Sequence, residues 1–209
     1  QSTITYADCI ALKEEIPEIV DLTPTCLGPA DVKFGPWKRT INVFGVDACY
    51  PVVTGRQLKE GRFYTPFEVE THRKVVVIGT TIAREIFKGV NPIGERLTIN
   101  GQKFVVIGIF EEKGRIMEFD MDALAFIPFT CAMSLFNSKR ITEIIVLTKG
   151  GPALTQAEDH VFEVLKVRHG GRIDFNTQTQ GEILRQLDVI MDTLTMAVAG
   201  IAGVSLVVG

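Results

Sequence analysis

The sequence predicts an α+β fold in which a β-rich unit is inserted into a discontinuous domain. The first 50 residues carry a helix pattern followed by two strand patterns, and residues 137–180 carry strand, helix and strand patterns. Between them, residues 51–136 are dense in short apolar strands and turn residues. We therefore expect residues 1–50 and 137–180 to form one domain, residues 51–136 to form the insertion, and residues 181–209 to form a helix that leaves the domain.

The opening part of the chain predicts a helix and two strands. In "TYADCIALKEEI", residues 5–16, Thr5 can cap the helix with Asp8 three residues later, and apolar residues recur on one face. Pro17 ends the helix, because a proline there removes a hydrogen bond and clashes one turn back. "EIVDLTPTC" and "KRTINVFGVD" have strand patterns, and the Gly- and Pro-containing "LGPADVKFGP" between them, residues 27–36, predicts turns.

The inserted unit predicts buried strands and a tight hairpin. "KVVVIGTTIAREIFKG" is a continuous β-branched run, a glycine and a helix, and such runs mark strands buried on both faces. "ERLTINGQKFVVIGIFEE" predicts a hairpin, because Asn100-Gly101 is the preferred type I′ turn pair between apolar alternations. "KGRIMEFDMD" predicts a loop, "ALAFIPFT" a strand, and "CAMSLF" a short helix.

The closing part predicts a strand over 141–151, a helix over 152–168 and a strand over 170–178. A helix beginning at Glu182 then runs into the uncharged segment Thr193–Gly209. Its 17 residues would rise about 25 Å, short of the roughly 30 Å hydrocarbon core of a bilayer. Its small residues (Gly200, Ala202, Gly203 and Ser205) are typical of helix packing in membranes. We expect the outer part of a transmembrane helix that is truncated at Gly209.

Composition excludes some classes of partner and site. The 209-residue chain has a formal net charge of -3 and no Lys/Arg-rich block, which argues against a nucleic-acid partner. Its four cysteines (Cys9, Cys26, Cys49 and Cys131) have spacings unlike a zinc site or a small disulfide framework. We expect them to be small buried hydrophobic residues, with one or two disulfides as the alternative in an oxidising compartment.

Residue types that carry chemistry do not form an enzyme motif. The chain lacks a phosphate-binding GxxxxGK[ST] loop, and the strand–Gly79–helix segment lacks GxGxxG, so a simple strand-to-helix turn is the expectation. Ser205 lacks the second glycine of a nucleophile elbow. His72 and His160 have no metal-ligand spacing, and His169 is expected to act as a positive group at a helix end.

Two acidic pairs, Glu111-Glu112 just before the predicted loop over 113–122 and Asp120/Asp122 at its end, are also present. A weak cation site is conceivable there, but solvated loop charges are the expectation. The sequence therefore predicts no catalytic residue, no cofactor-binding residue and no metal ligand.

A series of motifs resembles a known family. "INVFGVDACYPVV", "LKEGRFYTPFEVE", "KVVVIGTTIAREIFKGVNPIGERLTINGQKFVVIGIFEEKG", "ALAFIPFT" and "GIAGVSLVVG" follow one another over nearly the whole chain. This series is similar to the extracytoplasmic core domain of MacB-like ABC transporter permeases, which include lipoprotein-release permeases and the cell-division permease FtsX. Cys49 after "GVDA" departs from the usual family pattern, and the loop "EEKGRIMEFDMD" carries no recognisable substrate code.

The resemblance implies a non-catalytic domain on the periplasmic side of the bacterial inner membrane. It implies a porter-like part over 1–50 and 137–180, an inserted β-rich part over 51–136, and a connecting helix and transmembrane start over 181–209. It further implies a dimer, a cytoplasmic ATPase that drives shape changes outside the membrane, and a periplasmic adaptor protein or lipoprotein as a partner.

Two other hypotheses are consistent with parts of the sequence. The chain could be an extracytoplasmic binding or scaffold module whose last helix is buried in its own core or in a dimer. It could also be a nucleotide-binding α/β enzyme that uses Gly79, although the missing glycines of the dinucleotide motif disfavour this hypothesis.

Overall fold

The computed structural model describes residues 4–116, 119–138, 141–150 and 152–179. The chain divides into two compact units, residues 1–175 and 176–209, and all helices and strands named below belong to the first. Within the described ranges, no helix combines the length and apolar character needed to cross a membrane. The predicted helix from Glu182 and the predicted span from Thr193 lie outside the described residues.

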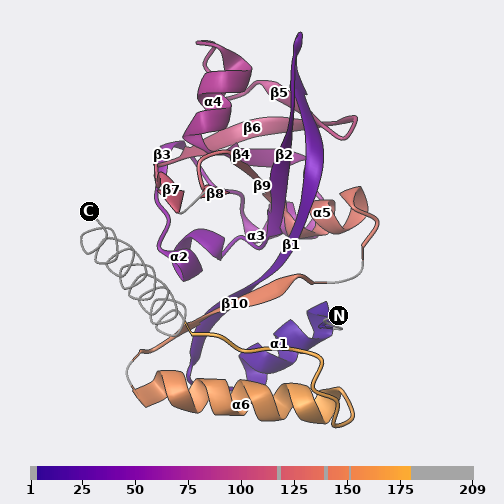
Figure 1. Cartoon of the computed structure of the whole chain (residues 1–209), viewed down its shortest axis with the longest axis vertical. Coiled ribbons are helices and arrows are strands. Elements are labelled where there is room, and N and C mark those ends of the chain that lie inside the picture. The colour runs from indigo at the N-terminus through magenta and orange to yellow at the C-terminus, as the bar shows by residue number, and fades with distance from the viewer. Residues whose placement is uncertain (1–3, 117–118, 139–140, 151, 180–209) are drawn as a thin grey trace, which may run out of the picture. The chain divides into compact units, whose positions relative to one another are not determined.

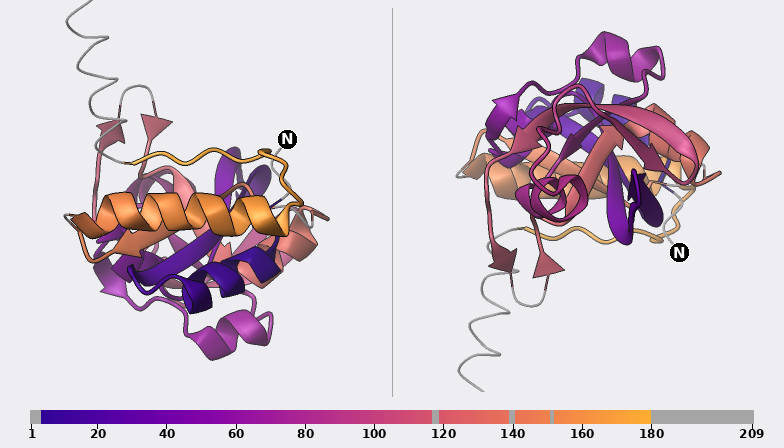
Figure 2. Two further views of the ribbon diagram at one scale, coloured as in Figure 1. Left: turned by 90° about the horizontal axis from the view of Figure 1, so that it is seen from below. Right: turned by 90° about the horizontal axis from the view of Figure 1, so that it is seen from above.

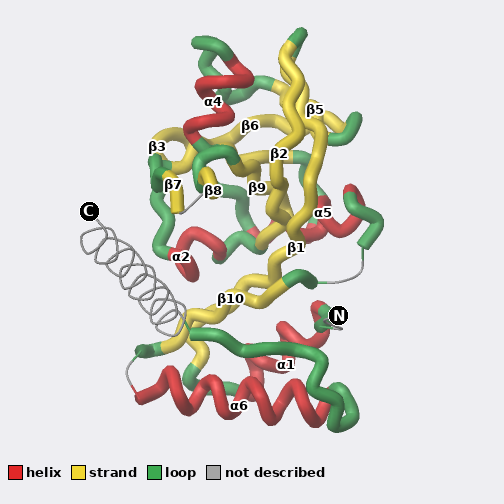
Figure 3. Tube along the Cα trace, viewed as in Figure 1, coloured by secondary structure: helices red, strands yellow, loops and turns green. Residues whose placement is uncertain are grey.

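The first unit is built on one mixed sheet of eight strands in the order β10-β1-β2-β9-β4-β6-β3, with β5 paired to β1 and β6 (Figures 1 and 3). The β2–β9 and β4–β6 pairs are parallel and the other pairs are antiparallel. These strands are β1 (Ile19–Phe34), β2 (Trp37–Val46), β3 (Leu58–Gly61), β4 (Val75–Ile78), β5 (Arg96–Ile99), β6 (Gln102–Phe110), β9 (Leu124–Pro128) and β10 (Glu143–Thr148). A separate two-stranded hairpin consists of β7 (Arg115–Ile116) and β8 (Phe119–Asp120).

Six helices in the described part accompany the sheet. They are α1 (Tyr6–Glu15), α2 (Tyr50–Thr54), α3 (Pro66–Glu70), α4 (Thr80–Phe87), α5 (Phe129–Leu135) and α6 (Pro152–Arg168). Helices α1 and α6 lie side by side next to β1 and β10, as the view from below shows (Figure 2). Helix α4 packs near the far end of the sheet, against β1, β2, β6 and β9 (Figure 1). The mixed α/β fold predicted from the sequence is therefore confirmed.

Strand β1 is the main correction to the predicted elements. The turns predicted over 27–36 are wrong up to Phe34, because β1 continues for 16 residues and pairs in register with β2 through Gly28, opposite Val43, and Pro29, opposite Asn42. The turn falls at Gly35, which has the positive φ of 54° that favours glycine. At about 3.3 Å per residue, a strand of this length spans roughly 50 Å and connects β10 at one end to β5 at the other.

The predicted β-rich elements of the middle region are confirmed. Strand β4 is fully buried, and its residues alternate between two hydrophobic clusters, with Val76 and Ile78 in one and Val75 and Val77 in the other. The β5–β6 hairpin turns at Asn100-Gly101 with φ values of 44° and 80°, as a type I′ turn requires.

Two further predicted segments differ. The loop predicted over 113–122 contains the short β7–β8 hairpin, and no strand forms over 170–178. The side chains of Asp174 and Phe175 pack instead against His169 and Phe162, so this segment is held by side-chain contacts rather than by a neighbouring strand. The division of the chain at residues 50 and 137 remains a prediction, and the sheet runs continuously across it.

Candidate functional site

Asp122 anchors the segment that carries the β7–β8 hairpin. Its carboxylate accepts hydrogen bonds from the backbone N–H groups of Lys113 (3.0 Å) and Gly114 (2.7 Å), which precede the hairpin, while Asp122 itself follows it. The residue is only 2% exposed. The prediction of solvated loop charges is therefore wrong for Asp122, although Glu111 and Glu112 are exposed. Within the described ranges, no group of three or more His, Cys, Asp or Glu side chains is placed to hold a metal ion.

Arg56 is the buried cation that faces this anchor. Its Nη2 atom lies 3.8 Å from Oδ1 of Asp122, and its guanidinium stacks over the rings of Phe110 (4.4 Å) and Phe126 (5.2 Å). In the described part of the chain, neither terminal nitrogen of Arg56 makes a hydrogen bond. The positive charge is therefore compensated by Asp122 and by the two aromatic faces. Arg56 follows Gly55 in the sequence, and its pairing with a residue 66 positions later was not predicted.

The second Gly-Arg pair has a different role, because Arg62 lies on the surface. Its two terminal nitrogens donate to the two oxygens of Glu68 at 2.7 and 2.8 Å, which is a bidentate pair. The hydrogen bonds from the Arg62 guanidinium lower the pKa of Glu68 to about 2. Burial opposes this decrease, and the hydrogen bond from the backbone N–H of Thr65 adds to it. Thr65 and Glu68 also form a capping box that begins α3. This pair therefore fixes the loop between β3 and α3.

Several glycines of the motif series stand where two backbones approach closely. A Cβ atom built on Gly79 would lie 2.1 Å from the carbonyl oxygen of Asp122, and one on Gly45 would lie 2.1 Å from Cβ of Ala132. A Cβ on Gly108 would meet the carbonyl oxygen of Arg62 at 2.4 Å. Gly79 is thus required for packing of the strand-to-helix turn against the Asp122 segment, which agrees with the prediction of a simple turn.

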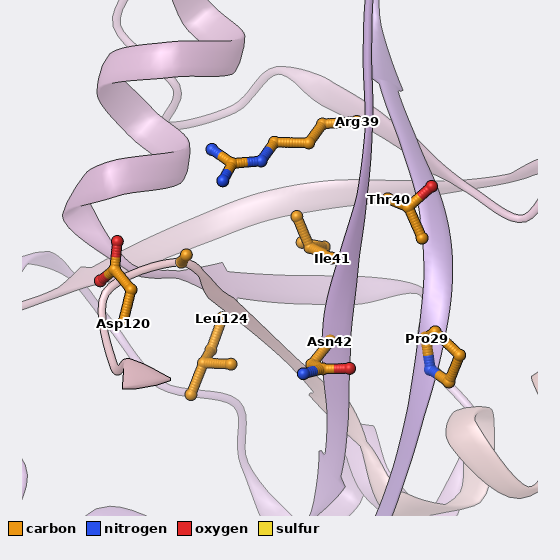
Figure 4. Close-up of a pocket in the computed structure, with 8 residues that line it drawn as sticks. Pro29, Arg39, Thr40, Ile41, Asn42, Asp120 and Leu124 are labelled. Atoms are coloured by element: carbon orange, nitrogen blue, oxygen red, sulfur yellow. The ribbon is translucent and has the colours of Figure 1, made fainter. Parts of the chain in front are cut away.

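A shallow pocket of about 260 Å³ lies beside the hairpin (Figure 4). It is lined by Pro29, Arg39, Thr40, Ile41, Asn42, Asp120, Ala123 and Leu124. The Arg39 side chain is paired with Glu85 of α4, and Asp120 accepts a hydrogen bond from Thr81 at 3.2 Å. Both charged groups are therefore satisfied by the protein, and the volume is below the roughly 300–1,000 Å³ of small-molecule sites. This pocket has no feature that selects a ligand.

A cluster of charged residues joins α1 to the end of α6. We call it the basal cluster, and it lines a pocket of about 370 Å³ with Thr5, Asp8, Arg168, His169, Arg172 and Asp174. The Nε atom of Arg168 donates to Oδ1 of Asp8 at 2.7 Å, and Thr5 donates to Oδ2 through its backbone N–H and its hydroxyl, each at 2.8 Å. Burial opposes ionisation of Asp8, but these hydrogen bonds outweigh it and lower the pKa of Asp8 to about 2. Asp8 is therefore an anion that both caps α1 and binds α6.

His169 lies directly after α6, as predicted for a helix-terminal group. Its Nδ1 atom is 2.6 Å from Oδ1 of Asp174 and its Nε2 atom is 3.5 Å from Oδ2 of Asp8. The other two histidines lie apart from this cluster, His160 beside Glu18 and His72 beside the backbone carbonyl of Glu70. Sequence reasoning identified the position of His169 but not its two carboxylate partners.

All four cysteines are free thiols, and three of them are buried. Burial raises the pKa of Cys9 to about 12 and those of Cys49 and Cys131 to about 11. A thiol with such a pKa is protonated near neutral pH and is a poor nucleophile. These cysteines match the expectation of small buried residues, with Cys49 only partly buried. Ser205, which was expected to be a small packing residue of the uncharged helix, lies outside the described residues.

Comparison with known proteins relates the chain to one family. A family model described as the MacB-like periplasmic core domain matches residues 1–163. The chain is 31% identical over 212 residues to the macrolide export ATP-binding/permease protein MacB of Bdellovibrio bacteriovorus, covering 99% of this chain and 33% of that protein. It is 27% identical over 209 residues to the pyoverdine export ATP-binding/permease protein PvdT of Pseudomonas savastanoi, covering 99% of this chain and 32% of the relative.

Solved structures show the same fold. The periplasmic region of MacB from Actinobacillus actinomycetemcomitans aligns with a TM-score of 0.77 at 24% identity, over 90% of this chain and 84% of that one. The extracellular domain of the transporter YknZ from Gram-positive bacteria aligns with a TM-score of 0.72 at 18% identity, over 81% of this chain and 86% of that one. The present chain spans about a third of the length of the MacB and PvdT relatives.

Proposed function

This chain belongs to the family of MacB-like periplasmic core domains, and from that premise we propose that it is the non-catalytic outer domain of an export-type ABC transporter permease. In this proposal, ATP hydrolysis in the cytoplasm changes the shape or position of the domain, and the domain handles a partner or substrate outside the membrane. The domain lies on the periplasmic side of the bacterial inner membrane.

The arrangement of α1, α6 and β1 is the observation that best supports this proposal. Helices α1 and α6 pack together, and the Asp8–Arg168 pair links them. Helix α1 also packs on β1, and α6 packs on β10. Strand β1 pairs with β10, β2 and β5, so one strand connects these parts of the sheet. A displacement applied at the two helices is therefore transmitted along one continuous strand to the far end of the sheet.

The proposed partners of this domain follow from the relatives by analogy. The names of the MacB and PvdT relatives join an ATP-binding part and a permease in one export protein. We propose that this domain likewise works with a cytoplasmic ATPase, as a homodimer or with a related permease, and contacts a periplasmic adaptor protein or lipoprotein. The division into a porter-like part (1–50 and 137–180) and an inserted part (51–136) belongs to the same proposal.

Labelling of an exposed cysteine tests the proposed location. We expect Lys59→Cys on the edge strand β3, made in the whole membrane protein with Cys49→Ser, to react with a membrane-impermeant maleimide in intact spheroplasts. Lys59 is exposed, whereas Cys9, Cys26 and Cys131 are buried. The Cys49→Ser parent without the added cysteine is the matched control for background labelling. Labelling of Lys59→Cys only after the membrane is permeabilised would contradict the periplasmic location.

A further inference from the structure

His169 sits between two carboxylates that come from different parts of the fold. Asp8 belongs to α1, and Asp174 belongs to the segment that follows α6. The two contacts leave from opposite nitrogens of one ring, Nδ1 toward Asp174 and Nε2 toward Asp8. The side chain of His169 is only 8% exposed, and the ring of Phe175 packs edge-on against it at 5.8 Å. The imidazole thus touches both carboxylates of the basal cluster.

The protonation state of the His169 ring determines whether one or both of these contacts are favourable. A neutral imidazole carries one N–H group, so it can donate to Asp174 or to Asp8 but not to both. The remaining nitrogen would then present a lone pair to a carboxylate oxygen. A protonated imidazole carries an N–H at both nitrogens, so the 2.6 Å contact to Asp174 becomes a charge-assisted hydrogen bond and the 3.5 Å contact to Asp8 becomes an ion pair. The geometry therefore matches the charged form of His169.

The other charges of the basal cluster leave this preference in place. Arg168 and Arg172 are cations that line the same pocket and oppose protonation of the ring. Arg168, however, is committed to Oδ1 of Asp8, whereas Oδ2, which also accepts from Thr5, faces Nε2 of His169. The two carboxylates contact the imidazole directly, Asp174 at 2.6 Å and Asp8 at 3.5 Å, and their negative charges favour the protonated ring.

We propose that the basal cluster is a proton-operated clamp, in which protonated His169 ties the segment after α6 to α1 and loss of its proton releases the contact with α1. The shorter contact, to Asp174, persists through the single remaining N–H group. The longer contact, to Asp8, is lost, while the Arg168–Asp8 pair remains between α1 and the end of α6.

The direction of the pH dependence follows from the charges. The hydrogen bond to Asp174 raises the pKa of His169, burial opposes this, and the hydrogen bond to Asp8 adds to the increase. A raised pKa in the folded state means that the stabilisation is complete below the unfolded value of about 6.5 and is lost as the pH rises through the folded value. Asp8, with a pKa of about 2, remains ionised throughout this range. The clamp is therefore tightest at mildly acidic pH and loosens as the pH rises.

The clamp is a property of this chain, and only its effect on transport rests on the proposed function. In that proposal, α1 and α6 receive the movement from the membrane. Ring titration and hydrogen exchange are measured on the purified 209-residue chain, so their outcome does not depend on the cellular location. A failed maleimide test and a failed clamp test are thus distinguishable.

The test combines an NMR titration of the His169 ring with amide hydrogen exchange of α1 between about pH 5 and pH 9, corrected for intrinsic exchange rates. We expect His169 to titrate above 6.5. Protection of the α1 amides should fall by roughly two- to fivefold as His169 loses its proton, which is the size expected for the loss of one long ion-pair contact. Protection in β4, which is remote from the cluster, should stay constant.

Two histidine variants provide the matched comparison. His169→Gln offers a neutral side chain and should abolish the pH dependence of α1 protection, whereas His160→Gln, also on the α6 segment, should retain it. Titration of His169 at or below 6.5 in the wild-type chain would overturn the proposal without any variant. Equal pH dependence of α1 protection in wild type and His169→Gln would overturn it as well.

Discussion

Replacing Asp122 with alanine should lower the free energy of unfolding by about 3–5 kcal/mol, the cost of leaving the partner of a buried ion pair uncompensated. The substitution removes the acceptor of the Lys113 and Gly114 N–H groups and leaves the guanidinium of Arg56 buried opposite no anion. Denaturant unfolding followed by circular dichroism measures the change. The control in the same segment is Glu112→Ala, which removes an exposed carboxylate and should change stability by less than about 0.5 kcal/mol.

A second substitution separates the charge effect from loss of the loop contacts. In Asp122→Ala/Arg56→Met, the uncompensated cation is gone and an apolar chain of similar length packs between Phe110 and Phe126. We expect this double variant to be more stable than Asp122→Ala alone, because a buried ion pair is often replaced by apolar residues at little cost. If Arg56→Met made Asp122→Ala still less stable, the role assigned to this ion pair would be wrong.

Replacing Gly45 with alanine should destabilise the fold by about 1–3 kcal/mol or more, the usual range for overpacking a core. The added Cβ would lie 2.1 Å from Cβ of Ala132, so β2 and α5 would have to move apart. Neither side chain has a flexible end that could swing away. Thermal and denaturant unfolding of the variant measure the loss.

The matched control removes the methyl group of Ala132, which is the atom that the added Cβ would meet. Ala132→Gly alone removes the opposing methyl group and should cost about 1 kcal/mol, because glycine is unfavourable within a helix. In Gly45→Ala/Ala132→Gly the clash is relieved, so the double variant should be more stable than the sum of the two single effects predicts. Simple additivity would show that close approach of β2 and α5 is not the reason for glycine at position 45.

Local sequence signals predicted the elements that local interactions determine. The β4 run is β-branched because both of its faces are buried, and Asn100-Gly101 specifies its own turn geometry. Pro17 and the Thr5–Asp8 capping box likewise define α1 from residues that are neighbours in sequence. For these elements, the sequence pattern and the final structure have the same physical cause.

Elements determined by distant partners were missed. Gly28 and Pro29 resemble turn residues, but Gly28 provides the room that the Phe136 ring occupies, and the β2 register holds both residues in an extended strand. The segment 170–178 has a strand-like pattern, yet it has no strand partner in the described structure and is held instead by contacts to His169 and Phe162. Tertiary contacts override local propensity in both cases.

The candidate sites follow the same rule. The Gly-Arg pairs were visible in the sequence, but only the fold shows that Arg56 is buried beside Asp122 whereas Arg62 pairs with Glu68 at the surface. His169 was correctly placed at a helix end, while Asp8, 161 positions earlier, becomes its neighbour only when α1 packs on α6. A single sequence does not reveal such long-range charge pairs.

In the function that we propose, this domain moves in response to ATP in the cytoplasm without performing catalysis itself. The most direct measurement is the distance between spin labels at Lys59→Cys in two copies of the whole transporter, reconstituted in lipid with and without ATP under non-hydrolysing conditions. The account predicts two different distance distributions, one for each nucleotide state. The same distribution in both states, in a preparation whose ATPase is active, would contradict it.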